Sequence, residues 1–211
     1  MSPNDALEAE ALQIALAGRR IGHRVIVLEQ TTSTNDVVAQ MAPTSAEGLV
    51  VFAERQSAGR GQYGRRWESA ARRGLWLSIL LRPDLAVAES ARLTNYLVEA
   101  VAATVGEQCG IATSIKPPND LYGNDLKIAG VLVEMRVEAS GGYCAIAGLG
   151  VNVNQTSEDF PPELKDSAGS LAMITGRVVD RFELAIALLR ELDARYLQFK
   201  RPKKGTLARI I

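Results

Sequence analysis

Residues 126–154 read LKIAGVLVEMRVEASGGYCAIAGLGVNVN, and this stretch decides the expected fold. Two runs rich in Val, Ile and Leu flank the turn SGG, a pattern that predicts an antiparallel β-hairpin. Further strands are expected at residues 24–30, 48–56, 74–83 and 113–116, and helices at 5–18, 35–41, 86–108, 170–175 and 181–199. Because strands and helices do not alternate regularly, the order predicts an α+β fold rather than a parallel α/β fold.

Two of these elements carry explicit boundary signals. Asp5 is expected to cap the first helix, and Gly18 is expected to end it. The strand in the run TSIKPPND is expected to stop at Pro117 and Pro118, because proline has no N–H to donate to a sheet.

The composition is that of a globular protein, with 47% hydrophobic and 23% charged residues among 211. Lys plus Arg and Asp plus Glu both number 24, so there is no global attraction to nucleic acid or to an anionic membrane. No apolar run reaches the length of a membrane span, and the acidic N-terminus does not read as a signal peptide. We therefore expect a soluble, cytoplasmic protein that binds neither DNA nor membrane.

Residues 58–67, AGRGQYGRRW, combine three glycines at G-x-G-x-x-G spacing with three arginines and a tryptophan. This is not the dinucleotide fingerprint, because no helix is expected to begin within the glycines, and no Gly-Lys-Ser/Thr of a Walker loop follows. Glycines expose backbone N–H groups, arginines match anions, and Trp67 offers a face on which a base can stack. The run therefore indicates a site for a nucleotide phosphate, with a solvated basic hairpin loop as the alternative.

Common catalytic sets are excluded by counting. The chain has one histidine, His23, and lacks a G-x-S-x-G sequence, so a hydrolase triad is not expected. One histidine and the two separated cysteines, Cys109 and Cys144, also make a zinc site or a disulfide framework improbable.

Three further polar stretches interrupt apolar strands: STND (33–36), KPPNDLYGNDLKIAGVLVE (116–134) and GLGVNVN (148–154). The first places hydroxyl and amide groups at a helix N-terminus, where a polar ligand can bind, although ordinary helix capping explains it too. In the second, Lys127 lies at the start of an apolar strand. It is either a site residue or a surface lysine whose aliphatic chain lies along the protein surface. The third is either part of a site or a strand end with turn-forming residues.

Together, STND, ERQSAGRGQYGRRW, KPPNDLYGNDLKIAGVLVE and GLGVNVN fall in the order found in biotin–protein ligases, which this chain resembles over about residues 30–155. The resemblance implies a mixed, largely antiparallel sheet flanked by helices, the catalytic-domain fold shared with class II aminoacyl-tRNA synthetases. It implies an enzyme that uses ATP and Mg²⁺ to convert biotin to biotinyl-5′-AMP with release of pyrophosphate. The biotin would then pass to a lysine of a carboxylase biotin carrier domain.

The resemblance also implies roles for particular residues. Biotin-binding roles fall on Ser33, Thr34, Asn35, Gln56, Gly59, Arg60, Gly61, Lys127, Gly130, Gly148 and Gly150. Nucleotide-binding roles fall on Gln62, Gly64, Arg65, Trp67, Asn119, Asp120 and Asn152. Lys127, Arg60 and Asp120 are the expected catalytic residues, and no direct metal ligand is expected beyond Asp120, since Mg²⁺ would be held through ATP.

The chain departs from the family at two positions. Gln62 stands where the glycine loop usually has arginine, so the adenylate is expected to be held less tightly unless Arg66 substitutes. Pro117 stands where the family has tryptophan, so the cavity wall is expected to be reshaped, with Trp76 as a substitute.

The resemblance implies one catalytic domain over residues 1–211, with a lead-in at 1–23, the ligase core at 24–200 and a short tail at 201–211 in place of the family's C-terminal β-barrel. Without a DNA-binding segment, no operator binding is expected. A homodimer and carrier docking by strand addition are further expectations. Two alternatives stay open: a lipoate-type acyl-adenylate ligase, and a biotin-binding module with impaired catalysis.

Overall fold

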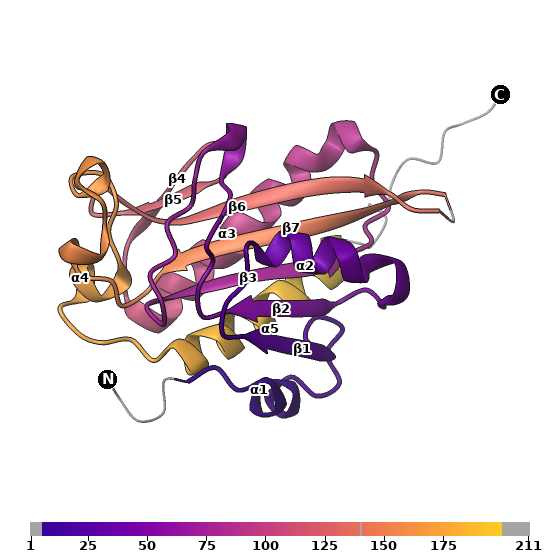
Figure 1. The fold of residues 1–211 in the computed structure, drawn as a ribbon, viewed down its shortest axis with the longest axis horizontal. Helices are drawn as coiled ribbons and strands as arrows, with labels where there is room; N and C mark the ends of the chain where they lie inside the picture. Colours follow the sequence, from indigo (N-terminus) through magenta and orange to yellow (C-terminus); the bar gives the residue numbers. More distant parts are fainter. Residues whose placement is uncertain (1–5, 140, 200–211) are drawn as a thin grey trace.

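Seven strands form one sheet in the computed structural model, which describes residues 6–139 and 141–199 (Figure 1). The strands are β1 (Arg24–Leu28), β2 (Leu49–Ala53), β3 (Gly74–Leu81), β4 (Thr113–Lys116), β5 (Asp120–Gly123), β6 (Leu126–Val137) and β7 (Tyr143–Asn152). The helices are α1 (Ala9–Ala15), α2 (Thr34–Met41), α3 (Ser90–Cys109), α4 (Leu171–Thr175) and α5 (Arg181–Phe199). This architecture confirms the predicted α+β class.

The strand order is β1-β2-β3-β7-β6-β5-β4, so β7 lies between β3 and β6. Only β1 and β2 pair in parallel, and every other neighbouring pair is antiparallel. The predicted hairpin of β6 and β7 is confirmed, with Gly130 opposite Gly150 and Val137 opposite Tyr143. The sheet is therefore mixed and largely antiparallel, as the resemblance implied.

Helices cover both faces of the sheet, with α2 on one face and α3 and α5 on the other (Figure 1). Side chains of β3 alternate between these faces, because successive residues of a strand point in opposite directions. Leu75, Leu77, Ile79 and Leu81 join the larger core with α3 and α5, whereas Leu80 joins a smaller core beneath α2. Burial on both faces explains why this strand reads as a continuous apolar run, interrupted only by Ser78.

Helix α5 begins at Arg181, as predicted, because Asp180 caps it. The Asp180 carboxylate accepts the backbone N–H groups of Phe182 and Glu183 at 2.9 and 3.1 Å. The Arg181 side chain is buried and forms an ion pair with Glu54, which follows β2, at 2.6 Å. This contact fixes the start of α5 against the sheet.

Several predicted boundaries are wrong. Helix α1 begins at Ala9 with Glu8 at its N-cap, so the predicted helix from Asp5 is too long, and Asp5 itself lies outside the described residues. The strand in the run TSIKPPND stops before Pro117, as predicted, and is β4, but strand β5, which begins at Asp120 beyond the cis Pro117–Pro118 bond, was not predicted. Strand β5 is short and was missed because its residues read as a turn.

The first turn of the helix predicted at residues 86–108 is a 3-10 turn, and α3 then runs from Ser90 to Cys109, with Gly110 as its left-handed C-cap. The tail expected at residues 201–211 lies outside the described residues. Within residues 6–139 and 141–199, no helix is both long and apolar enough to span a membrane.

Candidate active site

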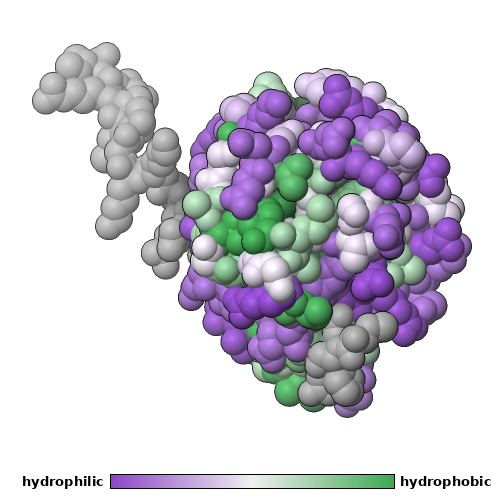
Figure 2. Space-filling model, turned by 90° about the vertical axis from the view of Figure 1, so that its left-hand side faces the viewer, coloured by the Kyte–Doolittle hydropathy of each residue, from purple (hydrophilic) through white to green (hydrophobic). Residues whose placement is uncertain are grey.

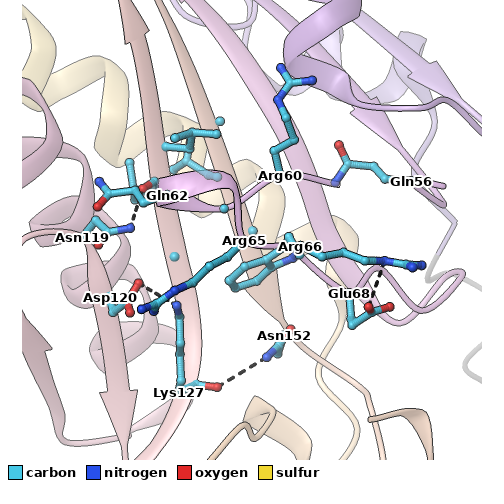
Figure 3. Close-up of a pocket in the computed structure, with 18 of the residues that line it drawn as sticks. Gln56, Arg60, Gln62, Arg65, Arg66, Glu68, Asn119, Asp120, Lys127 and Asn152 are labelled. Atoms are coloured by element: carbon cyan, nitrogen blue, oxygen red, sulfur yellow. Dashed lines mark hydrogen bonds and ion pairs between the residues drawn. The ribbon is translucent and has the colours of Figure 1, made fainter. Parts of the chain in front are cut away.

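A cavity of about 300 Å³ lies where the start of α2, the glycine loop and strands β5, β6 and β7 meet. Every residue to which the sequence assigned a site role lines this cavity, except Gly59 and Gly64. Figure 3 shows the residues from the glycine loop and from β5 and β6 facing one another across it. Stretches separated by more than a hundred residues thus share one site, although the role of each residue remains a prediction.

The structure adds lining residues that the sequence did not indicate. They are Glu68, Leu77, Tyr122, Val131, Leu132, Leu149, Phe160, Leu164, Ser167 and Ala168, and Arg66, named above only as a possible substitute for the missing arginine, lines the cavity as well. On β7, Leu149 lies between the predicted Gly148 and Gly150, and on β6, Val131 and Leu132 follow the predicted Gly130. The loop members lie at the cavity because the backbone of Lys127 hydrogen-bonds to residues 167–169. Lys127 N–H donates to Ser167 O at 2.8 Å, and Gly169 N–H donates to Lys127 O at 3.0 Å. No pattern in the loop sequence indicated this contact.

Lys127 and Asp120 form an ion pair at one end of the cavity, with 2.7 Å between Nζ and Oδ1 (Figure 3). A two-residue turn joins β5 to β6, and both turn residues, Asn124 and Asp125, have positive φ angles, as such tight hairpins require. A register shift between Leu121 and Tyr122 is a bulge of the kind that redirects side chains beside binding sites. The pair is half-buried and lines the cavity, so the Lys127 ammonium stays accessible to a ligand there.

The ring of Trp67 lies over Gly130 and Gly150, which are opposite each other on β6 and β7. A Cβ atom at Gly130 or Gly150 would lie 2.8 or 2.5 Å from that ring. The Nζ of Lys127 is 5.4 Å from the ring centroid, within reach of a cation–π interaction. The two glycines are therefore required by the tryptophan that covers them.

Trp76 does not take the place of a missing cavity wall, contrary to the expectation drawn from Pro117. Its side chain is buried and absent from the cavity lining, and its ring contacts Trp67 edge-on, with centroids 6.2 Å apart. Trp76 shares a face of β3 with Ser78 and Leu80, but it packs against Trp67 and does not line the cavity. Besides Trp67, the aromatic lining residues are Tyr122 and Phe160.

The glycine loop is a small hairpin, and the predicted absence of a helix after it is confirmed. Gly61 N–H donates to Arg65 O at 2.7 Å, and Trp67 N–H donates to Gly59 O at 2.9 Å. Tyr63 stands at the tip with a φ of 58° and is 87% exposed. The geometry is that of a hairpin loop, which excludes the dinucleotide fingerprint.

The arginines of this loop have different partners. Arg66 pairs with Glu68 at 2.9 Å, so its charge is already engaged. Arg65 forms no ion pair among the described residues, and it extends toward Lys127 and Asp120 in Figure 3. Arg65 is therefore better placed than Arg66 to compensate for the missing arginine at Gln62.

Arg60 is separate from the other two expected catalytic residues. Its guanidinium pairs with Asp36 at 2.8 Å and with Glu134 at 3.2 Å, and it points away from Lys127 in Figure 3. The hydrogen bond that Arg60 donates to Asp36 is the main cause of its raised pKa, with Glu134 adding to it. Arg60 therefore joins the glycine loop to α2 and β6 in this structure, and its catalytic role remains a prediction.

Hydroxyl and amide groups gather at the opposite end of the cavity. The backbone N–H of Thr34 donates to Gln56 Oε1 at 2.8 Å, and Gln56 Nε2 donates to Ser69 Oγ at 3.2 Å. Ser33, Thr34 and Asn35 are all buried. Since these groups are neutral donors and acceptors, this end suits a polar but uncharged part of a ligand.

Two predicted nucleotide-binding amides also hold the protein together. Asn152 donates to Gly169 O at 2.9 Å and accepts from Gln155 at 2.9 Å, while Asn119 donates to Val131 O at 2.9 Å. Much of their hydrogen-bonding capacity is therefore used in positioning loops. Within the described part of the chain, no three His, Cys, Asp or Glu side chains are grouped to hold a metal ion.

We expect Gly150→Ala to displace Trp67, because the new methyl group would lie within 3 Å of the indole. The tryptophan emission is expected to shift to longer wavelength as the ring becomes exposed. Gly106→Ala is the control, since its Cβ meets nothing closer than 3.8 Å. An unshifted spectrum for the Gly150 variant would contradict the packing described above.

Comparisons with known proteins agree on one family. Residues 27–152 match the model of the biotin/lipoate A/B protein ligase family. The bifunctional ligase/repressor BirA of Bacillus spizizenii is 36% identical over 198 residues, which are 93% of this chain and 61% of that protein. The biotin–[acetyl-CoA-carboxylase] ligase of Mycobacterium tuberculosis is 34% identical over 201 residues, covering 92% of this chain and 72% of that protein.

A solved structure is similar as well. The biotin protein ligase of Aquifex aeolicus, in complex with biotin and ATP, has a TM-score of 0.74 and 34% identity, covering 83% of this chain and 71% of that one. The present chain spans about three fifths of the length of the Bacillus relative.

Proposed function

Because the chain belongs to the biotin/lipoate A/B protein ligase family, we propose that it is an ATP-dependent biotin–protein ligase. It would form biotinyl-5′-AMP and pyrophosphate from biotin and ATP, and then transfer biotin to a lysine of a carboxylase carrier domain. The choice of carrier follows from the Mycobacterium relative, which is a biotin–[acetyl-CoA-carboxylase] ligase.

The observation that carries this proposal is the division of one cavity into a neutral end and a cationic end. Hydroxyl and amide groups around Thr34 and Gln56 suit the ureido ring of biotin. Lys127 and Arg65 at the other end suit the carboxylate of biotin and the phosphates of ATP. Trp67 lies between them with an aromatic face.

The chemistry needs no protein nucleophile, because the biotin carboxylate itself attacks the α-phosphate. The protein would hold both reactants in line and stabilise the charge that develops on phosphate, the work assigned to Lys127. The Asp120 carboxylate is a suitable oxygen ligand for Mg²⁺, which would neutralise phosphate charge when bound with ATP.

The neutral end of the cavity favours biotin over lipoate. A dithiolane ring has neither N–H donors nor a carbonyl acceptor, so it could make no hydrogen bonds to the buried amides and hydroxyls around Thr34. The named relatives are biotin ligases, which supports the same choice.

One assay distinguishes the candidate functions. Pyrophosphate release is measured with biotin and with lipoate, followed by transfer of labelled biotin to a carrier domain. Release and transfer with biotin alone are the expected results. Release with lipoate would indicate the lipoate-type ligase, and biotin binding without release would indicate an impaired binding module.

Partners and organisation follow as parts of the proposal. The ligase core would occupy residues 24–200 of one catalytic domain, acting in the cytoplasm without binding an operator. Carrier docking by strand addition at a sheet edge and a homodimer are included as predictions. A gel shift with the promoter of a biotin operon is expected to show no complex.

We expect Gln62→Arg to slow the dissociation of biotinyl-5′-AMP by about tenfold, since a charge-assisted hydrogen bond contributes about 1.5–3 kcal/mol when partly shielded. Gln62 lines the cavity, so an arginine there would reach the phosphate. Dissociation would be followed by chasing labelled adenylate with unlabelled ligand.

Tyr63→Arg is the matched control, because it adds the same charge at the exposed tip of the loop. It is expected to leave the dissociation rate unchanged. An equal effect of both variants would indicate a general electrostatic attraction rather than a contact made at position 62.

A further inference from the structure

A chain of hydrogen bonds lies behind the hydroxyl end of the cavity and connects Glu134 on β6 to Thr34 on α2. Asn35 Nδ2 donates to Glu134 Oε2 at 2.6 Å. Ser78 Oγ lies 2.5 Å from Asn35 Oδ1 and 2.7 Å from Thr34 Oγ1. Thr34 lines the cavity, whereas Ser78 and Glu134 do not.

The chemistry of these groups determines which atom carries each proton. An ionised carboxylate only accepts, so Asn35 must turn its NH₂ group to Glu134 and its carbonyl oxygen to Ser78. That carbonyl oxygen carries no proton, so Ser78 must donate its single hydroxyl proton to it across the 2.5 Å contact. In the 2.7 Å contact between Ser78 and Thr34, the Thr34 hydroxyl must then donate its proton to Ser78 Oγ.

With its proton turned to Ser78, the Thr34 hydroxyl presents lone pairs to the cavity. Gln56 Oε1 does not need that proton, because it already accepts the backbone N–H of Thr34 at 2.8 Å, closer than the hydroxyl at 3.1 Å. Thr34 therefore acts as an acceptor toward any ligand at this end.

The surroundings keep this arrangement in place. Ser78 is completely buried and Asn35 is 4% exposed, so bulk water has little access to either group. Arg60 pairs with the same Glu134 oxygen at 3.2 Å. Gly148 lies opposite Ser78, and a Cβ there would be 2.4 Å from Asn35 Oδ1, so only glycine leaves room for the amide.

We infer that Glu134 is a positioning residue that acts through Asn35 and Ser78 to make Thr34 an acceptor for a ring N–H of the substrate. The inference rests on the proposed function, since biotin offers two ureido N–H groups. A carboxylate that does not line the cavity would thereby make the site select a ring that carries N–H groups. Glutamine at this position could present either amide atom to Asn35, which would allow the whole chain to reverse.

The test uses Glu134→Gln and Ser78→Ala, singly and combined, in the full-length protein. The substrates are biotin and the two cyclic carbamate isomers in which one ring N–H is replaced by oxygen. Biotin-dependent pyrophosphate exchange gives kcat and KM for each. Glu138→Gln is the matched control, because this glutamate directly after β6 also accepts from an arginine, Arg82 at 2.7 Å, but does not line the cavity.

The wild-type protein is expected to prefer biotin over one carbamate isomer by about 10³-fold in kcat/KM, because oxygen would face an acceptor. Glu134→Gln is expected to raise the KM for biotin about tenfold and to reduce that preference to about tenfold, with kcat and the KM for ATP within about twofold. Glu138→Gln should behave as wild type. In the Ser78→Ala background, Glu134→Gln should have no further effect, since the chain is already interrupted.

Several results would overturn the inference. The inference would be overturned if the wild-type protein used both carbamates as efficiently as it uses biotin. This comparison needs no variant, so a variant that fails to fold does not prevent the test. The inference would also be overturned if a folded Glu134→Gln variant kept the wild-type preference for biotin over the carbamate, or if its kcat fell equally with all substrates. Wild-type protein without biotin-dependent exchange would instead overturn the proposed function, and the inference with it.

Discussion

Replacing Lys127 with methionine is expected to lower kcat for biotin-dependent pyrophosphate exchange by about 10³-fold, the upper end of the effect of one preorganised group. Methionine keeps much of the side-chain volume but removes the charge placed beside the reacting phosphate. It also removes the partner of Asp120 and the cation next to Trp67. Steady-state exchange at saturating biotin and ATP measures the loss.

Lys116→Met is the matched control for this variant. Lys116 lies on β4, is exposed, and its Nζ is 5.2 Å from the ring centroid of Tyr122, but it does not line the cavity. It is expected to keep wild-type exchange. A Lys127 variant that folds, by circular dichroism, and retains exchange within tenfold of wild type would remove Lys127 from the catalytic set.

Replacing Arg181 with methionine is expected to reduce the free energy of unfolding by about 3–5 kcal/mol, the usual cost of breaking a buried ion pair. Arg181 and Glu54 are 1% and 5% exposed, and Arg181 also donates to Gly74 O at 3.3 Å. Without the guanidinium, the Glu54 carboxylate would stay buried beside the ends of β2 and β3. Urea denaturation with an unchanged m-value would report the loss.

Two further variants separate the charge from the packing. The double variant Arg181→Met with Glu54→Leu is expected to recover most of the stability, because no charge is then left buried without a partner. Arg190→Met on the exposed side of the same helix removes only an exposed hydrogen bond to Ala15 O at 3.0 Å, so it is expected to change stability by no more than about 1 kcal/mol. A single Arg181 variant as stable as the Arg190 variant would contradict this account.

The elements with long periodic patterns were predicted well. Helix α5 begins and ends where expected, and the β6–β7 hairpin pairs around the expected turn, because both patterns extend over many residues. Strand β5 was missed and α1 was predicted too long, because short elements carry few periodic positions. Their ends depend on tertiary contacts, such as the pairing of β5 with β6.

The candidate site was also largely accessible from sequence, through the order of four short motifs. Those motifs did not indicate which of their residues contact one another. Asp120 and Lys127 meet on neighbouring strands of one hairpin, while Arg60 turns to Asp36 and Glu134. The partner of an arginine depends on which side chains the folded chain brings within about 4 Å, and a local pattern does not contain that information.

Periodicity and motifs in the sequence predicted the α+β class, the long hairpin and most of the polar residues around the cavity. These depend on local periodicity and on motifs, which are properties of short segments. The tertiary structure alone decided that β7 lies between β3 and β6, which places Ser78 beneath α2 and opposite Gly148. It also brought Glu134 to Asn35, 99 positions away in the chain. Such contacts depend on strand order and register, which follow from packing the whole chain on both faces of the sheet.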